Sequence, residues 1–216
     1  MRILFINPNS SAHMTDGIVA AARLAAPGAE ILGWTNQAGP PAIQGPEDGD
    51  AAVPGLLALL PAAKEAGADA IVIGCFDDTG LAEARAAAHC PVIGIGQAAF
   101  HAAAMLAGEF SALTTLAVSV PVIEGNIQAQ GFGPVCREVR ASGIPVLEVD
   151  EGAPETIAAL RADLAAMERA GDRAVVLGCA GMAAHLPALQ AGLSLRLVDG
   201  VRAAAGFAQA LARIGS

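Results

Sequence analysis

AGADAIVIGC, at residues 66–75, and AGDRAVVLGC, at residues 170–179, are two copies of one pattern. Aligned without gaps, the copies share six of ten residues, and two further positions exchange one aliphatic residue for another. In each copy a glycine and a charged residue close a helix, and the aliphatic run predicts a parallel strand buried on both faces. A Gly-Cys pair then ends the strand, where open α/β sheets place active-site groups. We therefore predict that Cys75 and Cys179 occupy equivalent strand ends in two related lobes.

Aliphatic runs alternate with Ala-rich amphipathic stretches along the whole chain. This alternation predicts an α/β fold with two pseudo-symmetric lobes, each a four-stranded parallel sheet flanked by helices, and an active site in the cleft between the lobes. The predicted strands are 2–6, 29–34, 70–73, 92–95, 112–119, 145–149, 174–177 and 196–198. The predicted helices include 14–25, 53–65, 81–87, 97–107, 154–169 and 201–213. Residues 37–54 are rich in glycine, proline and acids and predict a long functional loop.

The two copies also set the expected lobe boundaries. We assign residues 1–97 and 200–216 to the N-terminal lobe and residues 98–199 to the C-terminal lobe. The last helix follows Asp199-Gly200, which aligns with Ile95-Gly96 in the first lobe. This alignment leaves two places for the helix, and we expect it to pack back on the first lobe.

Composition excludes several classes of partner. The 216 residues are 54% hydrophobic and 15% charged, with a net charge of −9. No apolar run approaches the roughly 20 residues that a membrane helix needs. The N-terminus lacks a signal-peptide pattern. We therefore predict a cytoplasmic protein that binds no membrane, and no nucleic acid either, since it offers no basic stripe to phosphate backbones.

The cysteine and histidine spacing argues against a metal site. The four cysteines form no CxxC and have no paired histidines, so we predict neither zinc nor a disulfide framework. Cys90 and Cys136 are interpreted as structural, because free cysteine is among the most buried residue types. His13 follows a polar loop, where both solvent exposure and substrate contact stay open. The remaining histidines have no ligand-like spacing and are interpreted as structural: His89, His101 and His185.

The two strand-end thiols suit proton transfer at a carbon atom. A thiol near a helix N-terminus meets free N–H groups and the helix dipole, which favour the thiolate relative to an ordinary pKa of about 8.5. The same N–H groups can bind an oxyanion. A substrate with an acidic C–H beside a carbonyl would lose its proton to one cysteine and gain one from the other on the opposite face. No cofactor is needed, and Lys64, the only lysine available for a pyridoxal Schiff base, lies on a predicted helix away from the strand ends.

Five motifs resemble those of one known family: INPNSSAHMT at 6–15, GPPAI at 39–43, GCFDDTGL at 74–81, LTTL at 113–116 and LGCAGM at 177–182. Over its whole length the chain is similar to the hydantoin and allantoin racemase branch of the aspartate/glutamate racemase superfamily. The resemblance implies two pseudo-symmetric α/β lobes, two catalytic cysteines, no cofactor, a small-molecule substrate and a homo-oligomer.

Carried over by motif, the resemblance makes Cys75 and Cys179 the two catalytic bases. It implies that the substrate pocket is lined by Asn9, Ile43, Phe76, Asp78, Thr114, Thr115, Ala180 and Gly181. The chain departs from the family at residues 77–79, where Asp-Asp-Thr stands in place of the more usual Gly-Asp-Pro. Asp78 is then the matched acid, and the role of Asp77 stays open between a solvated helix-start acid and a group that orients substrate amides.

The motif loops contain no lysine or arginine that would anchor the carboxylate of a free amino acid. A neutral hydantoin ring offers N–H donors and carbonyl acceptors that Asn9 and two threonines can match. We therefore predict a cofactor-independent racemase that inverts the C5 stereocentre of 5-substituted hydantoins. Phe76 and Ile43 favour alkyl or aryl substituents over the ureido group of allantoin. Arg137 and Arg140, in a predicted helix after Gly133, stay open as cleft residues.

Other functions stay open at this stage. Within the same fold, the alternatives are an allantoin racemase, an aspartate- or glutamate-type amino-acid racemase, or a related thiol-dependent isomerase or decarboxylase. A decarboxylase of this kind needs only one thiol, so Cys179 argues against it. A noncatalytic small-molecule sensor could use the same hinged lobes, and we rank it last.

Overall fold

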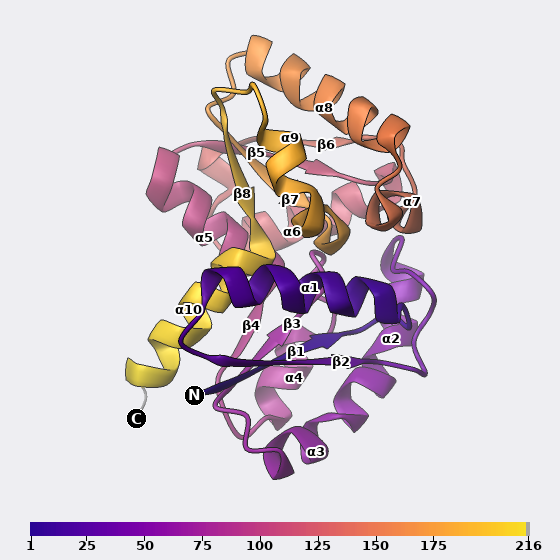
Figure 1. Cartoon of the computed structure of the whole chain (residues 1–216), viewed down its shortest axis with the longest axis vertical. Helices are drawn as coiled ribbons and strands as arrows, with labels where there is room; N and C mark the ends of the chain where they lie inside the picture. Colours follow the sequence, from indigo (N-terminus) through magenta and orange to yellow (C-terminus); the bar gives the residue numbers. More distant parts are fainter. Residues whose placement is uncertain (215–216) are drawn as a thin grey trace.

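The computed structural model describes residues 1–214, which form two α/β lobes stacked along the long axis of the molecule (Figure 1). Each lobe holds one four-stranded sheet in which every pairing is parallel. The first sheet has the order β2-β1-β3-β4, with β1 at Arg2–Asn7, β2 at Glu30–Thr35, β3 at Ala70–Ile73 and β4 at Val92–Gly94. The second has the order β6-β5-β7-β8, with β5 at Phe110–Thr114, β6 at Cys136–Ala141, β7 at Ala174–Gly178 and β8 at Arg196–Asp199. The predicted fold class is confirmed.

Helices fill the crossovers between the strands, as parallel pairing requires. The α-helices of the first half are α1 (Ala12–Ala25), α2 (Pro46–Ala58), α3 (Leu60–Glu65), α4 (Leu81–Ala87) and α5 (Ile95–Ala107). Those of the second half are α6 (Val120–Ala129), α7 (Val146–Glu151), α8 (Pro154–Arg169), α9 (Leu186–Gln190) and α10 (Gly200–Ile214). Three short 3₁₀ helices complete the described chain: η1 (Ala117–Ser119), η2 (Gly133–Val135) and η3 (Ala180–His185). Within residues 1–214, no helix combines the length and apolar character needed to cross a membrane.

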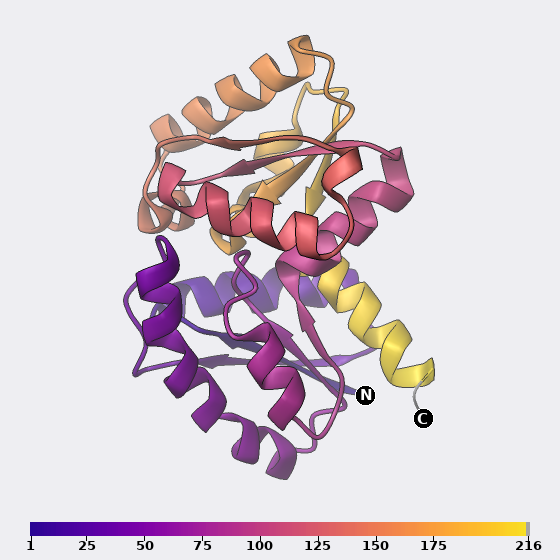
Figure 2. The ribbon, with the colours of Figure 1, turned by 180° about the vertical axis from the view of Figure 1, so that it is seen from behind.

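The strand β1 shows how the first sheet is buried on both faces. Its residues Ile3 and Phe5 belong to a large hydrophobic cluster that continues through both lobes. The alternate residues Leu4 and Ile6 belong to a smaller cluster with the side chains of α2, α3 and α4. These three helices cover the face of the first sheet opposite α1 (Figures 1 and 2). The two-residue period of a strand explains the division, and the larger cluster gives the lobes a shared core.

The two lobes exchange helices. The helix α5 follows the first sheet but packs on β5, β7 and β8 of the second, whereas α10 follows the second sheet and packs on α1 and β3 of the first. Both views show α10, in yellow, running beside the first lobe (Figures 1 and 2). The two chain segments cross at Gly200, where an added Cβ would lie 2.4 Å from the carbonyl oxygen of Ile95. The last helix of the described chain therefore lies against α1 and β3.

One predicted strand of the second lobe is wrong. Residues 146–149 form most of α7 and Pro145 is its N-cap, while the edge strand is β6, at 136–141, where a helix after Gly133 was expected. A short aliphatic run cannot be assigned by periodicity alone. In the structure, Val146 and Val149 are both buried, at the i, i+3 spacing of one helix face. The strand β6 is half-exposed along its length, so its sequence lacks the apolar run that marks the other strands.

Two further boundaries differ from the sequence prediction. The strand predicted at 112–119 ends at Thr114, because η1 forms at 117–119. The loop predicted at 37–54 is shorter, because Pro46 begins α2 and acids occupy its first turn. Proline at the first helical position and acids near the N-terminus are both favourable. The acidic composition of this segment therefore marks a helix start rather than a loop.

Candidate active site

The strand orders place a topological switch point in each lobe. In the first sheet the chain leaves β1 toward β2 on one side and returns to β3 on the other, and β5 has the same position between β6 and β7. Ligands of open α/β sheets bind beyond the carboxyl ends of the strands at such points. The segments that leave these ends are 8–11 and 74–80 in the first lobe, and 115–119 and 179–185 in the second.

All four segments contribute to one pocket, which is partly open to solvent and spans about 350 Å³ of space that no protein atom fills. The pocket contains both strand-end cysteines and most of the residues that the sequence assigned to it. Its lining consists of Asn9, Met14, Ile43, Gly74, Cys75, Phe76, Asp77, Thr114, Thr115, Ser119, Val146, Gly178, Cys179 and Ala180. Of the predicted site residues, Asp78 and Gly181 are not part of this lining.

Each thiol accepts hydrogen bonds from the turn that follows its strand. Cys75 follows β3, and its sulfur accepts the Thr79 hydroxyl at 3.4 Å and the backbone N–H of Asp77. Cys179 follows β7 and precedes η3, whose first turn directs the N–H groups of Gly181 and Met182 at its sulfur. Both turns therefore supply the donors that the sequence predicted.

Burial nevertheless raises the pKa of both thiols. Desolvation is the largest effect at each sulfur, and it brings the pKa of Cys179 to about 12 and shifts that of Cys75 in the same direction. The sequence-based expectation of a lowered thiol pKa is therefore reversed, because burial outweighs the hydrogen-bond donors. The charge of Cys179 also contributes to the raised pKa of Cys75.

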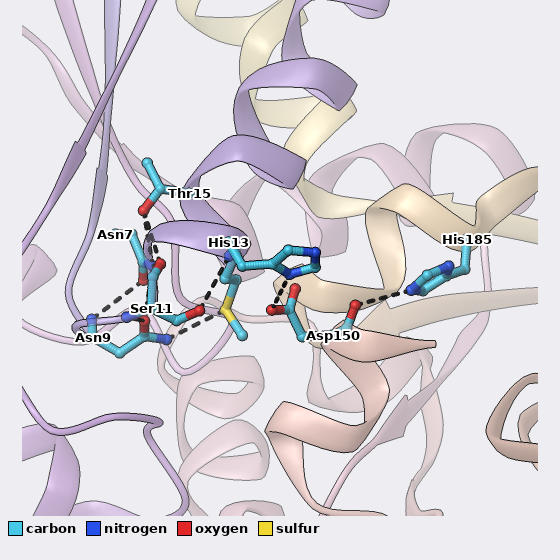
Figure 3. Close-up of polar contacts among 8 residues, drawn as sticks. Asn7, Asn9, Ser11, His13, Thr15, Asp150 and His185 are labelled. Carbon is cyan, nitrogen blue, oxygen red and sulfur yellow. Dashed lines mark hydrogen bonds and ion pairs between the residues drawn. The ribbon is translucent and has the colours of Figure 1, made fainter. Parts of the chain in front are cut away.

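Asn9 is held by a dense set of hydrogen bonds (Figure 3). Its Oδ1 accepts Asn7 Nδ2 at 2.8 Å and the backbone N–H of Ser11 at 2.9 Å, and its own N–H donates to Asn7 Oδ1 at 3.2 Å. Asn7 Nδ2 is also 3.1 Å from Thr15 Oγ1, which ties the loop to α1. Among the described residues, the side-chain N–H₂ of Asn9 has only Met14 Sδ, at 3.3 Å, as a partner. A thioether is a weak acceptor, so Asn9 offers donors to the pocket.

The remaining predicted lining residues form the pocket walls. Thr114 donates its hydroxyl to the Gly178 carbonyl at 3.1 Å, which joins β5 to β7 below the site. Thr115 is buried, and its carbonyl accepts the N–H of Gly143. Phe76 packs edge-to-face on Phe100 with ring centroids 5.5 Å apart. Ile43 and Ala180 are buried apolar residues that complete this wall.

Asp78 and Gly181 support the site from outside the lining. Asp78 accepts the N–H groups of Gly96 at 3.0 Å and Gln97 at 2.8 Å, at the start of α5, and burial raises its pKa to about 7. Its backbone has φ 51°, in the left-handed region. Gly181 lies against α7, where an added Cβ would be 2.9 Å from the Cα of Asp150. Asp78 thus caps a helix, and Gly181 lets η3 approach α7.

The structure adds six lining residues to the predicted set: Met14, Gly74, Asp77, Ser119, Val146 and Gly178. Asp77 was the acid without an assigned role. Met14 lies within the motif at 6–15 and Ser119 follows the motif at 113–116, but nothing in their own spacing indicates a site. Val146 was placed on a strand that does not form.

The remaining candidates lie elsewhere. Arg137 and Arg140 are on the edge strand β6, where they pair with Asp172 at 3.5 Å and Glu138 at 2.8 Å, and neither lines the pocket. Cys90 and Cys136 are also absent from its lining. Within residues 1–214, no three His, Cys, Asp or Glu side chains are grouped so that they could hold a metal ion.

His13 belongs to a contact between the lobes (Figure 3). Its Nδ1 lies 2.9 Å from Asp150 Oδ2, which links α1 of the first lobe to α7 of the second. The hydrogen bond and the charge of Asp150 raise the pKa of His13. His185, at the end of η3, contacts the Asp150 carbonyl at 3.2 Å. His13 is absent from the pocket lining and its side chain is largely exposed, and Asp150 connects it to the segment that begins at Cys179.

Comparison with known proteins gives consistent results. Residues 3–208 match the model of the family described as Asp/Glu/Hydantoin racemase. The whole chain is 41% identical to hydantoin racemase from Rhizobium meliloti and covers 90% of it, and it is 33% identical to hydantoin racemase from Pseudomonas sp. (strain NS671), covering 87%. Allantoin racemase from Klebsiella pneumoniae has a similar structure, with a TM-score of 0.94, 39% identity, and coverage of 100% of this chain and 89% of that chain. These similarities extend through both lobes and every segment that lines the pocket.

Proposed function

The chain belongs to the Asp/Glu/hydantoin racemase family and is a racemase, and on this premise we propose that it inverts the C5 stereocentre of 5-substituted hydantoins with two cysteines and no cofactor. One observation carries the proposal: Cys75 and Cys179 line a single pocket from equivalent strand ends of the two lobes. A flat ring bound between them would present one face of C5 to each thiol.

The proposed reaction is balanced by the two cysteines alone. One cysteine, as a thiolate, takes the C5 proton, and the electron pair left on C5 delocalises into the neighbouring ring carbonyl to form an enolate. The other cysteine, as a neutral thiol, donates its proton to the opposite face. The product is the other enantiomer, and the two cysteines have exchanged protonation states. The enzyme is then in the form that acts on the product enantiomer.

The surroundings of the pocket support both roles. Burial raises the pKa of each thiol, which keeps the proton donor neutral and makes the thiolate, once formed, a strong base. Positioned acids and bases of this kind typically contribute about 10²- to 10⁴-fold each. Asn9 offers amide donors to the developing enolate oxygen. A donor in such a place is worth about 2.7 to 4 kcal/mol in the transition state.

The pocket favours a neutral ring. Of the described residues that line it, none is lysine or arginine, so a free amino-acid carboxylate would lack a cationic partner. Ile43, Phe76 and Val146 form an apolar wall, which supports alkyl or aryl substituents at C5. Allantoin is the second candidate substrate, because the similar structure from Klebsiella pneumoniae is an allantoin racemase.

A chiral assay tests the substrate proposal. Single enantiomers of a 5-alkyl hydantoin, a 5-aryl hydantoin, allantoin, aspartate and glutamate are incubated with the protein, and the enantiomeric ratio is followed by chiral chromatography. We expect the hydantoins to racemise, free aspartate and glutamate to remain unchanged, and EDTA to have no effect. A kcat/KM for free glutamate above that for every hydantoin would move the protein to the amino-acid racemases.

We also propose a homo-oligomer in the cytoplasm. Large apolar side chains are exposed on α5 and α10, which supports a contact between copies: Met105, Leu106, Leu211 and Ile214. Light scattering during size-exclusion chromatography measures the assembled mass. A mass equal to one chain of 21.5 kDa would contradict the oligomer.

A further inference from the structure

Asp77 is a residue at which this chain departs from the usual sequence of the racemase family. The segment runs Gly74-Cys75-Phe76-Asp77-Asp78, with an acid where the family more usually has glycine. Of the described residues that line the pocket, Asp77 is the only one with a carboxyl group. The pocket of this chain therefore holds an anionic group that a glycine would not supply.

The carboxyl group of Asp77 lies in the electrostatic field of both thiols. Its charge contributes to the raised pKa of Cys75 on one side and of Cys179 on the other. The side chain accepts a hydrogen bond from Ser119, which also lines the pocket, and its backbone carbonyl accepts Asn126 Nδ2 at 2.8 Å. Both lobes thus hold Asp77 in place, since Ser119 and Asn126 belong to the second.

No cationic side chain among the described lining residues balances this carboxylate inside the pocket. Burial raises the pKa of Asp77 to about 6, so the group is ionised in mildly alkaline solution. Of the described lining residues, none carries a positive charge. Ser119 supplies one donor, and a carboxylate has about four acceptor positions. Acceptor capacity is therefore left for a ligand.

The enolate determines which part of a hydantoin faces this acid. Negative charge that develops on the ring carbonyl would be destabilised beside a carboxylate and stabilised beside an amide donor. The ring carbonyl is therefore expected to face Asn9, which comes from a different segment than Asp77. The substituent at C5 is left to face Asp77 and Ser119.

On the basis of the proposed function, we propose that Asp77 determines which C5 substituents the enzyme accepts. It favours substituents that donate N–H groups or carry positive charge, and it disfavours those that end in a carboxylate. Ureido and guanidinium groups donate two or more hydrogen bonds to a carboxylate, and bonds to an ionised partner are the stronger ones. A carboxylate in the same place would meet a like charge in a desolvated pocket. Long apolar substituents would lie along Ile43 and Phe76 and gain nothing from the acid.

Four hydantoins that differ in the end group of the C5 substituent separate these effects: 5-(3-guanidinopropyl), 5-(3-ureidopropyl), 5-(2-carboxyethyl) and 5-butyl. The wild type is compared with Asp77→Asn, which keeps the shape, and with Asp77→Gly, which restores the family residue. Glu83→Gln, an exposed acid at the start of α4, is the matched control for loss of one negative charge outside the pocket. The readout is kcat/KM for each compound at pH 8, divided by the value for the butyl compound, so that a general change in thiol reactivity cancels.

In the wild type we expect the guanidino and ureido compounds to exceed the carboxyethyl compound by about 100-fold or more. In both Asp77 variants we expect this ratio to fall by about tenfold or more, while Glu83→Gln keeps the wild-type ratio. A ratio that stays within about threefold of wild type in Asp77→Asn and Asp77→Gly overturns the role of Asp77 but leaves the racemase activity on hydantoins intact. If the wild type racemises none of the four compounds, the proposed function fails, and this inference fails with it.

Discussion

Replacing Gly181 by alanine is expected to move the catalytic turn without touching a catalytic atom. Gly181 is the second residue of η3, the segment that begins directly after Cys179, and its N–H group donates to the thiol. An added Cβ would lie 2.9 Å from the Cα of Asp150, 3.0 Å from its Cβ and 3.1 Å from its backbone nitrogen. Two of these three atoms are backbone, and Asp150 is anchored by His13 and His185. No flexible side chain can move aside.

The magnitude follows from these distances. Carbon atoms in contact prefer about 3.5 to 4.0 Å, so η3 or α7 must retreat by roughly 0.5 to 1 Å. Overpacking of this kind costs about 1 to 3 kcal/mol of stability. A displacement near 1 Å at reacting groups can cost about 100-fold in rate. We therefore expect Gly181→Ala to fold, to lose about 1 to 3 kcal/mol of unfolding free energy, and to lose about ten- to 100-fold in kcat/KM.

Urea unfolding and a chiral racemisation assay measure the two effects on the same preparation. Gly206→Ala is the matched control, because Gly206 is exposed within α10 and an added Cβ there meets nothing within 4 Å. Alanine in a helix interior is about 0.5 to 1 kcal/mol better than glycine, so the control should gain stability and keep its activity. Wild-type stability and activity in Gly181→Ala would refute the argument that close packing of η3 on α7 positions Cys179.

Three further predictions concern charged and titrating groups. Asp78→Ala should lower the free energy of unfolding in urea by about 2 kcal/mol, because two N–H groups at the start of α5 lose their acceptor and alanine must adopt φ 51°. Asp78→Asn should lower it by about half as much, since asparagine tolerates this backbone conformation. Equal losses in the two variants would contradict the role of Asp78 as a helix cap. The pKa of His13 is raised, so its pair with Asp150 stabilises the fold below the ordinary histidine pKa of about 6.5 and is lost as pH rises through the folded value. His13→Ala should therefore lower the melting temperature more at pH 5.5 than at pH 8.5. The corresponding loss of unfolding free energy should be below about 1 kcal/mol, because His13 is exposed. A lower melting temperature at pH 8.5 alone would contradict this reasoning. Burial raises the pKa of both thiols, so kcat/KM should rise between about pH 7 and pH 9 as more thiolate forms. The free energy of unfolding should fall above about pH 8.5, because the unfolded chain then releases thiol protons that the native protein keeps. A plateau in kcat/KM from pH 6 upward would indicate an acidic thiol.

The repeated strand was the informative part of the sequence. Its two copies became β3 and β7, which are central and fully buried, and a continuous apolar run is what such strands require. Because each copy ends in Gly-Cys, the equivalence of the two strands was sufficient to bring Cys75 and Cys179 to one pocket. The edge strand β6 was missed for the opposite reason, since its half-exposed residues carry no comparable signal.

Other features depend on contacts that sequence patterns do not encode. Asp77 and Asp78 are adjacent acids, yet one lines the pocket and the other caps α5, and the left-handed backbone of Asp78 separates them. His13 and Asp150 are 137 positions apart in the chain and meet only when the lobes pack. The raised thiol pKa values likewise reflect burial in the folded protein, whereas the sequence shows only the nearby helix starts.

The central claim is that Cys75 and Cys179 act on opposite faces of one carbon atom. The most direct measurement follows one enantiomer of a 5-alkyl hydantoin in D₂O at early times and determines the deuterium at C5 of both enantiomers by mass spectrometry after chiral separation. A two-base mechanism predicts a product that carries deuterium at C5, because the second thiol has exchanged with solvent and donates deuterium. The remaining substrate keeps protium at C5. Cys75→Ser and Cys179→Ser should both abolish racemisation, and each should retain exchange on at most one enantiomer. A product that retains the substrate's own proton, or near wild-type racemisation by Cys179→Ser, would contradict the two-cysteine account.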